Sequence, residues 1–151
     1  MRIYRLKRNQ FLPVSMNTAW QFFSDPGNLP EITPPWLGFR LIQKTPESVY
    51  AGMIISYRLT PLPYLTVNWT TEITHLKAPD FFVDEQRFGP YKFWHHQHLF
   101  KAVGSGTEMT DIVHYAMGFG VLGDLVHRFI VSPRLNNIFD FRYEKLKVIF
   151  S

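Results

Sequence analysis

The sequence predicts an α+β domain in which a curved antiparallel sheet wraps around a long C-terminal helix. Three observations support this prediction. A strand-like segment at the N-terminus precedes short helical segments, residues 36–117 break into apolar and aromatic runs separated by turn residues, and residues 122–149 change to helical spacing. That order of elements is typical of an α+β fold. At 151 residues the chain has the length of one domain, which we expect to span residues 1–151.

The N-terminal elements are expected to be one strand and a short helix. Strand-forming residues dominate Ile3–Leu12, and the proline that follows cannot donate to a β-ladder, so the strand should end there. Ser15 is a suitable N-cap for a helix whose apolar residues recur at helical spacing to residue 24. Turn-forming residues occupy 25–28, and one more helical turn is expected over 29–32, before two prolines.

Six further strands are expected in the centre of the chain. Apolar, β-branched and aromatic runs alternate there with connectors that contain proline or glycine, which set the backbone angles of tight turns. This pattern is typical of an antiparallel meander. The expected strands cover residues 36–44, 52–60, 64–76, 81–88, 92–103 and 107–117.

The C-terminal helix is indicated by apolar residues at i, i+3 and i+4 spacing. One such run extends from Leu122 to Ile130 and a second from Leu135 to Ile149. Pro133 separates the two runs and can occupy a first helical position with the preceding serine as its cap. A break or kink is therefore expected near Pro133.

Composition excludes several classes of function. The chain has no cysteine, which removes thiol nucleophiles, disulfides and Cys-based metal sites. With 16 Lys and Arg against 12 Asp and Glu, the formal charge of +4 is too small for a nucleic-acid-binding stripe, and no nucleic-acid partner is expected. No window is long and apolar enough to span a membrane, and the N-terminus lacks the apolar stretch of a signal peptide. We therefore expect a cytoplasmic protein.

Successive side chains of a strand point to opposite faces, so the central strands have a solvent-exposed face and a face that should contact the C-terminal helix. One set of positions includes the charged residues Glu72, Arg87 and Lys101, and we expect it to form the solvent-exposed face. The opposite set is mostly aromatic and aliphatic. It consists of Trp69, Thr71, Ile73, Phe82, Asp84, Gln86, Trp94, His96, His98, Phe100, Met109, Asp111, Val113 and Tyr115.

Five polar residues share this otherwise apolar face: Asp84, Gln86, His96, His98 and Asp111. An unpaired buried polar group costs on the order of 1–3 kcal/mol, so these side chains should either bond with one another or serve a site. They can form a closed hydrogen-bonded network, they can orient the polar end of a ligand in a cavity, or His96, His98 and a carboxylate can bind a metal. His-x-His on a strand places both imidazoles on one face. Because no third ligand has a diagnostic spacing, we assign no metal residues and expect no cofactor.

Acid–base catalysis is a further hypothesis for the same residues. A histidine beside a carboxylate is held as one tautomer and its charged form is stabilised, as in many general bases. The catalytic candidates are His96, His98 and Asp111. No serine lies in a nucleophile-elbow context, so covalent hydrolysis is not expected.

A glycine motif precedes the C-terminal helix. Gly118, Gly120 and Gly123 match G-x-G-x-x-G, but the βαβ unit of a dinucleotide site is missing, because the chain ends with that helix. We expect these glycines to form the junction between strand and helix.

Short motifs are spread over essentially the whole chain. They are Phe11-Leu12-Pro13-Val14-Ser15, Ala19-Trp20-Gln21-Phe22-Phe23-Ser24-Asp25-Pro26, Ile32-Thr33-Pro34-Pro35-Trp36, Asp84-x-Gln86-x-x-Gly89-Pro90-Tyr91, Trp94-x-His96-x-His98-x-Phe100, Met109-x-Asp111-x-Val113-x-Tyr115 and Ile138-Phe139-x-Phe141-Arg142. Together they resemble a subgroup of bacterial single-domain proteins in the SRPBCC (START-like) superfamily.

This resemblance implies a helix-grip fold, with a seven-stranded antiparallel sheet, two short helices after the first strand and a long C-terminal helix over a hydrophobic cavity. Superfamily members carry lipids, sterols, hormones or polyketides, act as aromatase/cyclases, or serve as interaction modules, and the fold does not choose among these functions.

We expect binding of a small, largely apolar molecule, of lipid, polyketide or aromatic type, between sheet and helix. The alternatives are a cyclase or dehydratase that uses a His–Asp pair, and an interaction module with a filled core. The expected ligand-binding residues are Trp69, Phe82, Asp84, Gln86, Trp94, His96, His98, Phe100, Asp111 and Tyr115.

Overall fold

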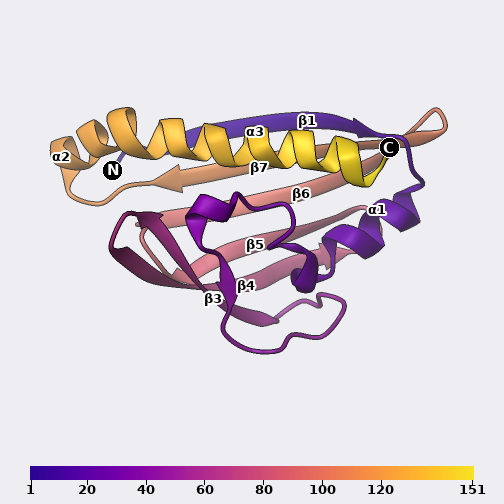
Figure 1. The fold of residues 1–151 in the computed structure, drawn as a ribbon, viewed down its shortest axis with the longest axis horizontal. Helices are drawn as coiled ribbons and strands as arrows, with labels where there is room; N and C mark the ends of the chain where they lie inside the picture. Colours follow the sequence, from indigo (N-terminus) through magenta and orange to yellow (C-terminus); the bar gives the residue numbers. More distant parts are fainter.

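The computed structural model describes residues 1–151, which form one seven-stranded antiparallel sheet and a long C-terminal helix (Figure 1). In sheet order the strands are β1 (Tyr4–Leu12), β7 (Gly106–Ala116), β6 (Phe93–Val103), β5 (Phe81–Phe88), β4 (Leu65–Lys77), β3 (Ile54–Leu62) and β2 (Arg40–Leu41). The helices are α1 (Met16–Phe23), α2 (Gly120–Val126) and α3 (Ser132–Ile149). The predicted α+β helix-grip architecture is confirmed. None of the helices combines the length and hydropathy needed to cross a bilayer.

The first strand and the first helix follow the prediction. Ser15 lies in an extended conformation, and its hydroxyl accepts a hydrogen bond from the backbone N–H of Thr18 at 3.2 Å, which caps α1. Ala19 and Phe23 lie on the buried side of this helix, which places them against the sheet. The capped helix thereby closes one end of the layer between the sheet and α3 (Figure 1).

The predicted strand over 36–44 is wrong. The segment begins with a 3-10 turn, η2 (Pro35–Leu37), because its prolines preset φ values that suit a tight helical turn. Gly38 ends this turn with φ 58°, a left-handed conformation that glycine tolerates. Only Arg40 and Leu41 then pair with β3, as the short edge strand β2.

The helical turn predicted over 29–32 is also not observed. That segment consists of irregular turns, and the short helix lies earlier, as the 3-10 turn η1 (Pro26–Asn28). The carboxylate of Asp25 accepts from the N–H of Gly27 at 2.8 Å and caps η1, which explains why turn-forming residues start a helix here.

The break predicted near Pro133 is replaced by a π-helical turn, η3 (His127–Val131), which joins α2 to α3. The N–H of Ser132 donates to the carbonyl of His127, five residues earlier rather than four. Since Pro133 has no N–H for the ordinary α-helical bond, the wider turn lets the helix continue past the proline. The predicted cap at Ser132 does not form, because α3 continues directly from η3 and Ser132 is already its first helical residue, with Val131 before it and no side-chain cap.

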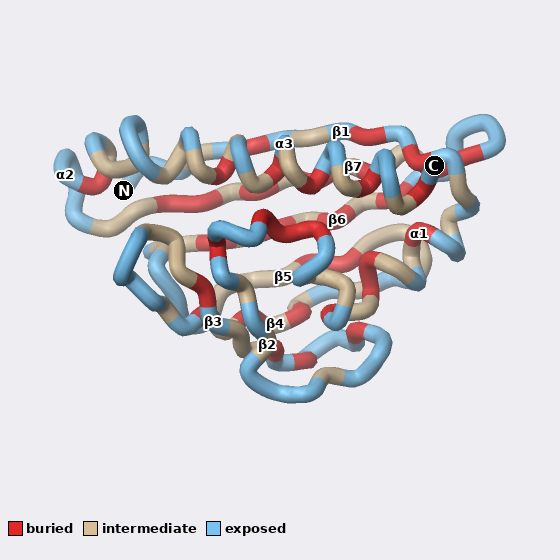
Figure 2. The backbone as a smooth tube through the Cα atoms, in the orientation of Figure 1, coloured by how far each residue is buried: buried red, intermediate tan, exposed pale blue.

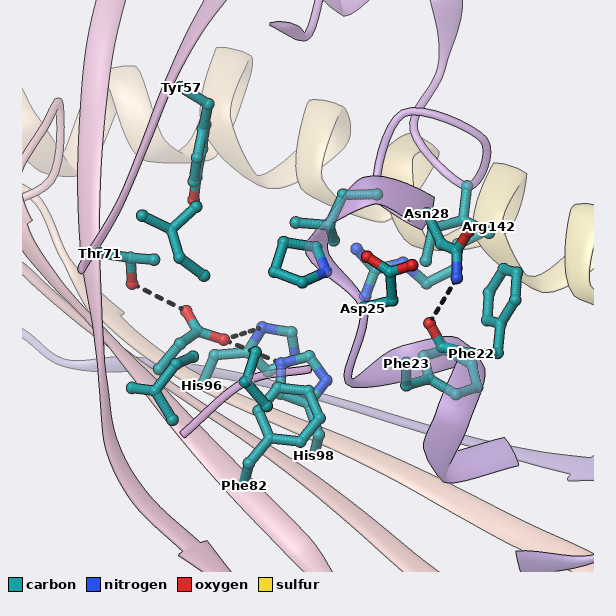
Figure 3. Close-up of a pocket in the computed structure, with 17 residues that line it drawn as sticks. Phe22, Phe23, Asp25, Asn28, Tyr57, Thr71, Phe82, His96, His98 and Arg142 are labelled. Carbon is teal, nitrogen blue, oxygen red and sulfur yellow. Dashed lines mark hydrogen bonds and ion pairs between the residues drawn. The ribbon is translucent and has the colours of Figure 1, made fainter. Parts of the chain in front are cut away.

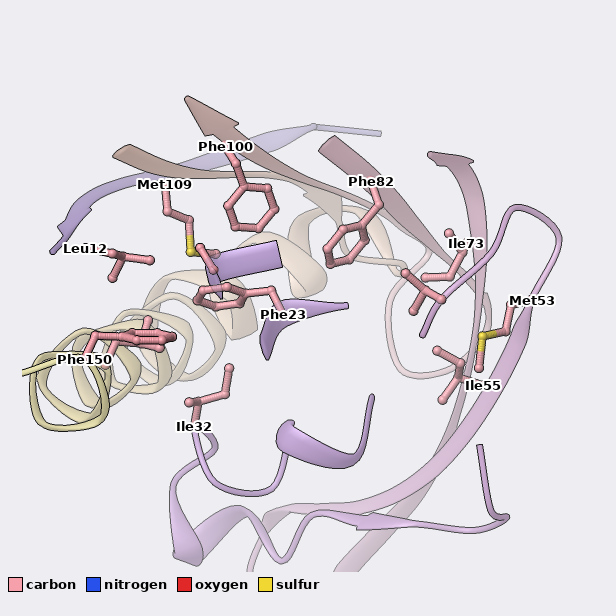
Figure 4. Packing of buried hydrophobic residues seen from close by; sticks show 13 residues of the cluster. Leu12, Phe23, Ile32, Met53, Ile55, Ile73, Phe82, Phe100, Met109 and Phe150 are labelled. Atoms are coloured by element: carbon pink, nitrogen blue, oxygen red, sulfur yellow. The ribbon is translucent and has the colours of Figure 1, made fainter. Parts of the chain in front are cut away.

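The inner face predicted from strand alternation is confirmed. Asp84 and Gln86 are half-buried, and every other residue assigned to that face is buried. Buried segments follow β5, β6 and β7 along the sheet (Figure 2). One hydrophobic cluster gathers around α1 and the C-terminal end of α3, with Phe23, Phe100 and Phe150 among its members (Figure 4). A second cluster lies between the sheet and the N-terminal half of α3. It contains Trp69, Trp94, Val113, Tyr115, Leu135 and Phe139.

The glycine motif forms the junction between β7 and α2, and Gly123 is its tightest point. A Cβ atom at Gly123 would lie 1.9 Å from the carbonyl oxygen of Gly118. Gly123→Ala is therefore expected to displace α2 and lower the free energy of unfolding by about 1–3 kcal/mol, as overpacking does. Gly118→Ala is the matched control, since its Cβ would meet nothing within 4 Å. Urea denaturation of both variants checks this, and equal stabilities would refute the steric argument.

Candidate functional site

A cavity of about 260 Å³ lies between the sheet and the N-terminal half of α3. Strands β3, β4 and β6 contribute Leu59, Trp69 and Trp94 to its wall, and α3 contributes Leu135 and Ile138. Apolar residues predominate in the lining, and the core is not filled at this place.

Aromatic rings form the sheet side of this cavity. Tyr57 and Trp69 stack with their ring centroids 5.8 Å apart, and Trp69 meets Trp94 edge to face at 5.0 Å. The ring of Tyr91, from the turn between β5 and β6, lies with its centroid 4.8 Å from that of Trp94. Such contacts hold large flat side chains in fixed positions, so the wall offers π-faces and apolar edges to a ligand.

Two arginines supply the positive charge in the lining. Arg134 lies over the ring of Trp36 at 5.1 Å and donates to the carbonyl of Pro61. Arg142 is buried, with its guanidinium 4.9 Å from the ring of Phe139. Two N–H groups in this wall, Trp69 Nε1 and Arg142 Nε, have no hydrogen-bond partner. Each unpaired buried donor costs on the order of 1–3 kcal/mol.

A second, smaller chamber of about 80 Å³ adjoins the first (Figure 3). Its sheet side carries Asp84, His96 and His98. Asp25, the residue that caps η1, and Arg142 on α3 lie on the other side. Leu29, Tyr57, His96 and Arg142 line both chambers, so these side chains form the partition between the apolar cavity and the chamber that also holds the ionisable side chains.

Two histidines and two aspartates form a closed cluster beside the smaller chamber. His96 Nε2 lies 2.8 Å from Asp111 Oδ1, and His98 Nε2 lies 2.8 Å from Asp84 Oδ2. The remaining ring nitrogens also face carboxylates: His96 Nδ1 lies 3.5 Å from Asp84 Oδ2, and His98 Nδ1 lies 3.2 Å from Asp111 Oδ1. The last contact has poor geometry for a hydrogen bond, and His98 Nδ1 is left without a partner. The imidazole rings lie with centroids 3.8 Å apart.

Strand register brings these four residues together. Asp84 on β5 is the direct cross-strand partner of His96 on β6, and His98 is the direct partner of Asp111 on β7. Because side chains two apart on a strand share a face, both imidazoles lie between the same two carboxylates.

Charge and burial act in opposite directions on the pKa values of the cluster. Burial and the neighbouring His98 lower the pKa of His96. Burial also acts to lower the pKa of His98, but the nearby carboxylates of Asp111 and Asp84 outweigh it and raise that pKa. For both aspartates burial acts to raise the pKa, but the two histidines outweigh it, and both carboxyl pKa values are lowered.

These directions favour ionised carboxyls at Asp84 and Asp111, and they favour protonation of His98 over protonation of His96. Arg142 adds a positive charge, with Nη1 3.9 Å from Asp111 Oδ2. Two carboxyl groups therefore face two imidazoles and a guanidinium in a buried space.

The other predicted site residues lie apart from this cluster. The side-chain amide of Gln86 exchanges two hydrogen bonds with the backbone of Tyr91, at 2.7 and 3.2 Å, and fixes the turn before β6. Phe100 packs in the core against Trp20 and Phe23. Tyr115 bonds through its hydroxyl to His127 at 2.9 Å. None of the three lines either chamber, whereas Phe82 lines the smaller one and stacks on His98 with centroids 4.2 Å apart.

Sequence reasoning did not assign Tyr57, Arg134 or Arg142 to the site. Arg142 lies on the apolar face of the C-terminal helix. A charged residue on an otherwise apolar face is the same feature that identified Asp111 as a candidate on its strand. Tyr57 alternates with Ile55 and Leu59 on β3 and could have been found by extending the parity argument to that strand. No signal in the sequence distinguishes Arg134.

Comparisons with known proteins agree with this architecture. The family described as polyketide cyclase / dehydrase and lipid transport matches residues 12–142. Ginseng major latex-like protein 151 from Panax ginseng has a TM-score of 0.71 at 12% identity, over 99% of this chain and 98% of that one. Protein CV1439 from Chromobacterium violaceum has a TM-score of 0.74 at 8% identity, over 97% and 96%. Protein Ms6760 from Mycobacterium smegmatis has a TM-score of 0.66 at 16% identity, over 96% and 92%. No curated protein matches the chain in sequence.

Proposed function

Because the chain belongs to the polyketide cyclase / dehydrase and lipid transport family, within the START-like helix-grip superfamily, we propose that it binds a compact, largely apolar molecule in the cavity between the sheet and α3. The observation that carries this proposal is an aromatic-walled space of about 260 Å³ that the protein's own side chains do not fill. Ligand sites are typically apolar cavities of roughly 300–1,000 Å³ with a few placed polar groups. The volume favours a small ring-bearing molecule over a long-chain lipid.

The polar groups in the wall favour a ligand with an acidic or other acceptor oxygen. Arg134 and Arg142 present positive charge, and the unpaired N–H groups of Trp69 and Arg142 are donors without acceptors. Because these two N–H atoms are themselves covered, a ligand oxygen in the cavity would meet the guanidinium charges first and would need a small side-chain movement to reach the unpaired donors. Such a ligand would place its apolar body against the Trp69–Trp94 wall and its polar end toward the partition.

The unfilled space favours binding over an interaction module with a filled core. Turnover of the bound molecule by a His–Asp pair would need a histidine at the apolar cavity. His96 is the histidine in that lining, so the enzymatic alternative rests on His96 and its partner Asp111.

Filling the cavity is expected to abolish binding without unfolding the protein. Ile138 lines the cavity from α3 and is half-buried, so Ile138→Trp places an indole in the space that the ligand would occupy. The probe is 8-anilinonaphthalene-1-sulfonate, which combines aromatic rings with an anion. We expect fluorescence titration to show at least a tenfold loss of affinity, because the probe must displace the new side chain.

The matched control is Val148→Trp, which adds the same side chain to the same helix at a position that is 70% exposed. This variant should bind the probe as the wild type does. Equal affinities of the wild type and Ile138→Trp, with both proteins folded by circular dichroism, would show that the cavity is not the binding site.

A further inference from the structure

The ring nitrogens of His96 and His98 and the carboxylate of Asp84 converge beside the smaller chamber. We propose that these three residues bind a divalent transition-metal cation with the ligand preference of zinc, and that Asp111 orients both imidazoles toward it. Ligand atoms from the three residues lie within 4.8 Å of one another (Figure 3). This site is independent of the apolar ligand proposed above.

The distances suit a metal. His98 Nε2 and His96 Nδ1 lie 2.8 and 3.5 Å from the same oxygen of Asp84, Oδ2. A tetrahedral cation with bonds of about 2.0–2.1 Å holds its ligand atoms about 3.4 Å apart. The two observed separations lie on either side of that value, the shorter by about 0.6 Å and the longer by about 0.1 Å, so side-chain shifts of roughly half an ångström would admit a cation.

The opposite nitrogens are held as metal-bound histidines usually are. A histidine that binds a metal typically donates its other N–H to a carboxylate, which fixes the tautomer and raises the basicity of the ligand. Asp111 Oδ1 lies 2.8 Å from His96 Nε2, with which it forms a hydrogen bond, and 3.2 Å from His98 Nδ1, which has no hydrogen-bond partner, so a small rotation of the His98 ring would let one carboxylate hold both. Arg142 approaches the other oxygen of Asp111 and steadies the carboxylate.

A hydrogen-bonded network alone does not satisfy the four ring nitrogens. Each faces a carboxylate oxygen, but a neutral imidazole has one N–H and one lone pair. If His96 Nε2–H donates to Asp111, the lone pair of His96 Nδ1 points at Asp84 Oδ2, which is repulsive. If one ring is an imidazolium, three nitrogens can donate, and one lone pair still faces a carboxylate oxygen. Donors at all four nitrogens would need two imidazolium rings with centroids only 3.8 Å apart, and like charges at that distance repel.

A divalent cation removes this conflict. It would accept the lone pairs of His96 Nδ1 and His98 Nε2 together with an oxygen of Asp84, and both remaining N–H groups would then point at Asp111. The three ligands also line the chamber of about 80 Å³, which has room for water molecules. A fourth coordination position would therefore open to that chamber, as in zinc sites with three protein ligands.

The test uses the metal alone. The purified chain is treated with a chelator, dialysed and titrated with Co²⁺, whose visible absorption reports coordination geometry, and then with Zn²⁺ against a chromophoric competitor. We expect one equivalent of Co²⁺ in a low-symmetry site, displaced by one equivalent of Zn²⁺. His98→Ala should abolish the absorption, and Asp111→Asn should weaken Zn²⁺ binding by 10–100-fold, the usual effect of losing an outer carboxylate.

The control variant is His95→Ala, which removes the imidazole that directly precedes His96 in sequence but lies on the opposite face of β6. It should bind Co²⁺ as the wild type does. Wild-type protein that takes up no Co²⁺, or binding that survives His98→Ala, or binding that is lost equally in His95→Ala, would overturn the proposal.

A measurement on the wild type keeps the proposal testable if His98→Ala does not fold. Imidazole ¹⁵N NMR resolves the ring nitrogens of the six histidines. One equivalent of Zn²⁺ should shift one nitrogen in each of two histidines and leave the other four rings unchanged. Shifts in other histidines, or none, would contradict the site.

Discussion

Replacement of Arg142 by methionine is expected to lower the free energy of unfolding by about 3 kcal/mol. Arg142 is 9% exposed, and its guanidinium is the cation nearest Asp111 on the α3 side, with Nη1 3.9 Å from Oδ2. Methionine preserves most of the apolar stem and removes the charge. The variant leaves the buried carboxylate of Asp111 without its guanidinium neighbour, and removal of one partner of a buried ion pair typically costs about 3–5 kcal/mol. The 3.9 Å separation places the expected loss at the lower end.

Urea denaturation of Arg142→Met measures this loss. Lys147→Met is the control on the same helix, because Lys147 is solvent-exposed and pairs with Glu144 at the surface, and it should change stability by less than about 0.5 kcal/mol. If Arg142→Met were as stable as the wild type, the charges assigned to the buried cluster would be wrong.

Leu146→Ala is expected to cost about 2–5 kcal/mol, the range for large-to-small changes in a packed core. Leu146 is 1% exposed and belongs to the cluster that joins the C-terminal end of α3 to α1 and the sheet. A shortened side chain leaves a void that Phe23 and Phe150 can fill only in part, since both are fixed by edge-to-face contacts with Phe22. The C-terminal end of α3 is also expected to pack less tightly against α1 and the sheet.

Val148→Ala provides the comparison two residues later, where the side chain is 70% exposed and truncation should cost less than about 0.5 kcal/mol. Thermal denaturation of the two variants separates the effects. Similar losses at both positions would mean that α3 does not pack on the sheet through Leu146.

The strands and their inner face follow from periodicity alone. Trp94, His96, His98 and Phe100 lie at every second position of β6, and a period of two assigns them to one face whatever the rest of the fold does. Pairing across strands was not predictable in the same way. That Asp84 faces His96 depends on the β5–β6 register, which the turn at Gly89–Tyr91 sets.

The cavity and the helix could be predicted only in part. A cavity depends on how side chains from three strands and a helix fill space, and alternation measures no volume. Pro133 correctly marked an irregularity in the helix. Whether a proline ends a helix or is accommodated by a π turn depends on how the residues before and after it pack. The contact between Arg142 and Asp111 was not predictable for the same reason, because it depends on how α3 is rotated about its axis when it packs on the sheet.

Methyl NMR during titration with 8-anilinonaphthalene-1-sulfonate would test most directly whether the cavity binds a compact apolar molecule. Leu59, Leu135 and Ile138 line the cavity, whereas Leu122 and Leu125 are exposed on α2 and offer an alternative apolar surface. Ligand binding in the cavity predicts saturable shifts of the first three residues, with smaller changes on α2. Shifts confined to Leu122 and Leu125, or no saturable shifts at all, would contradict the proposed function.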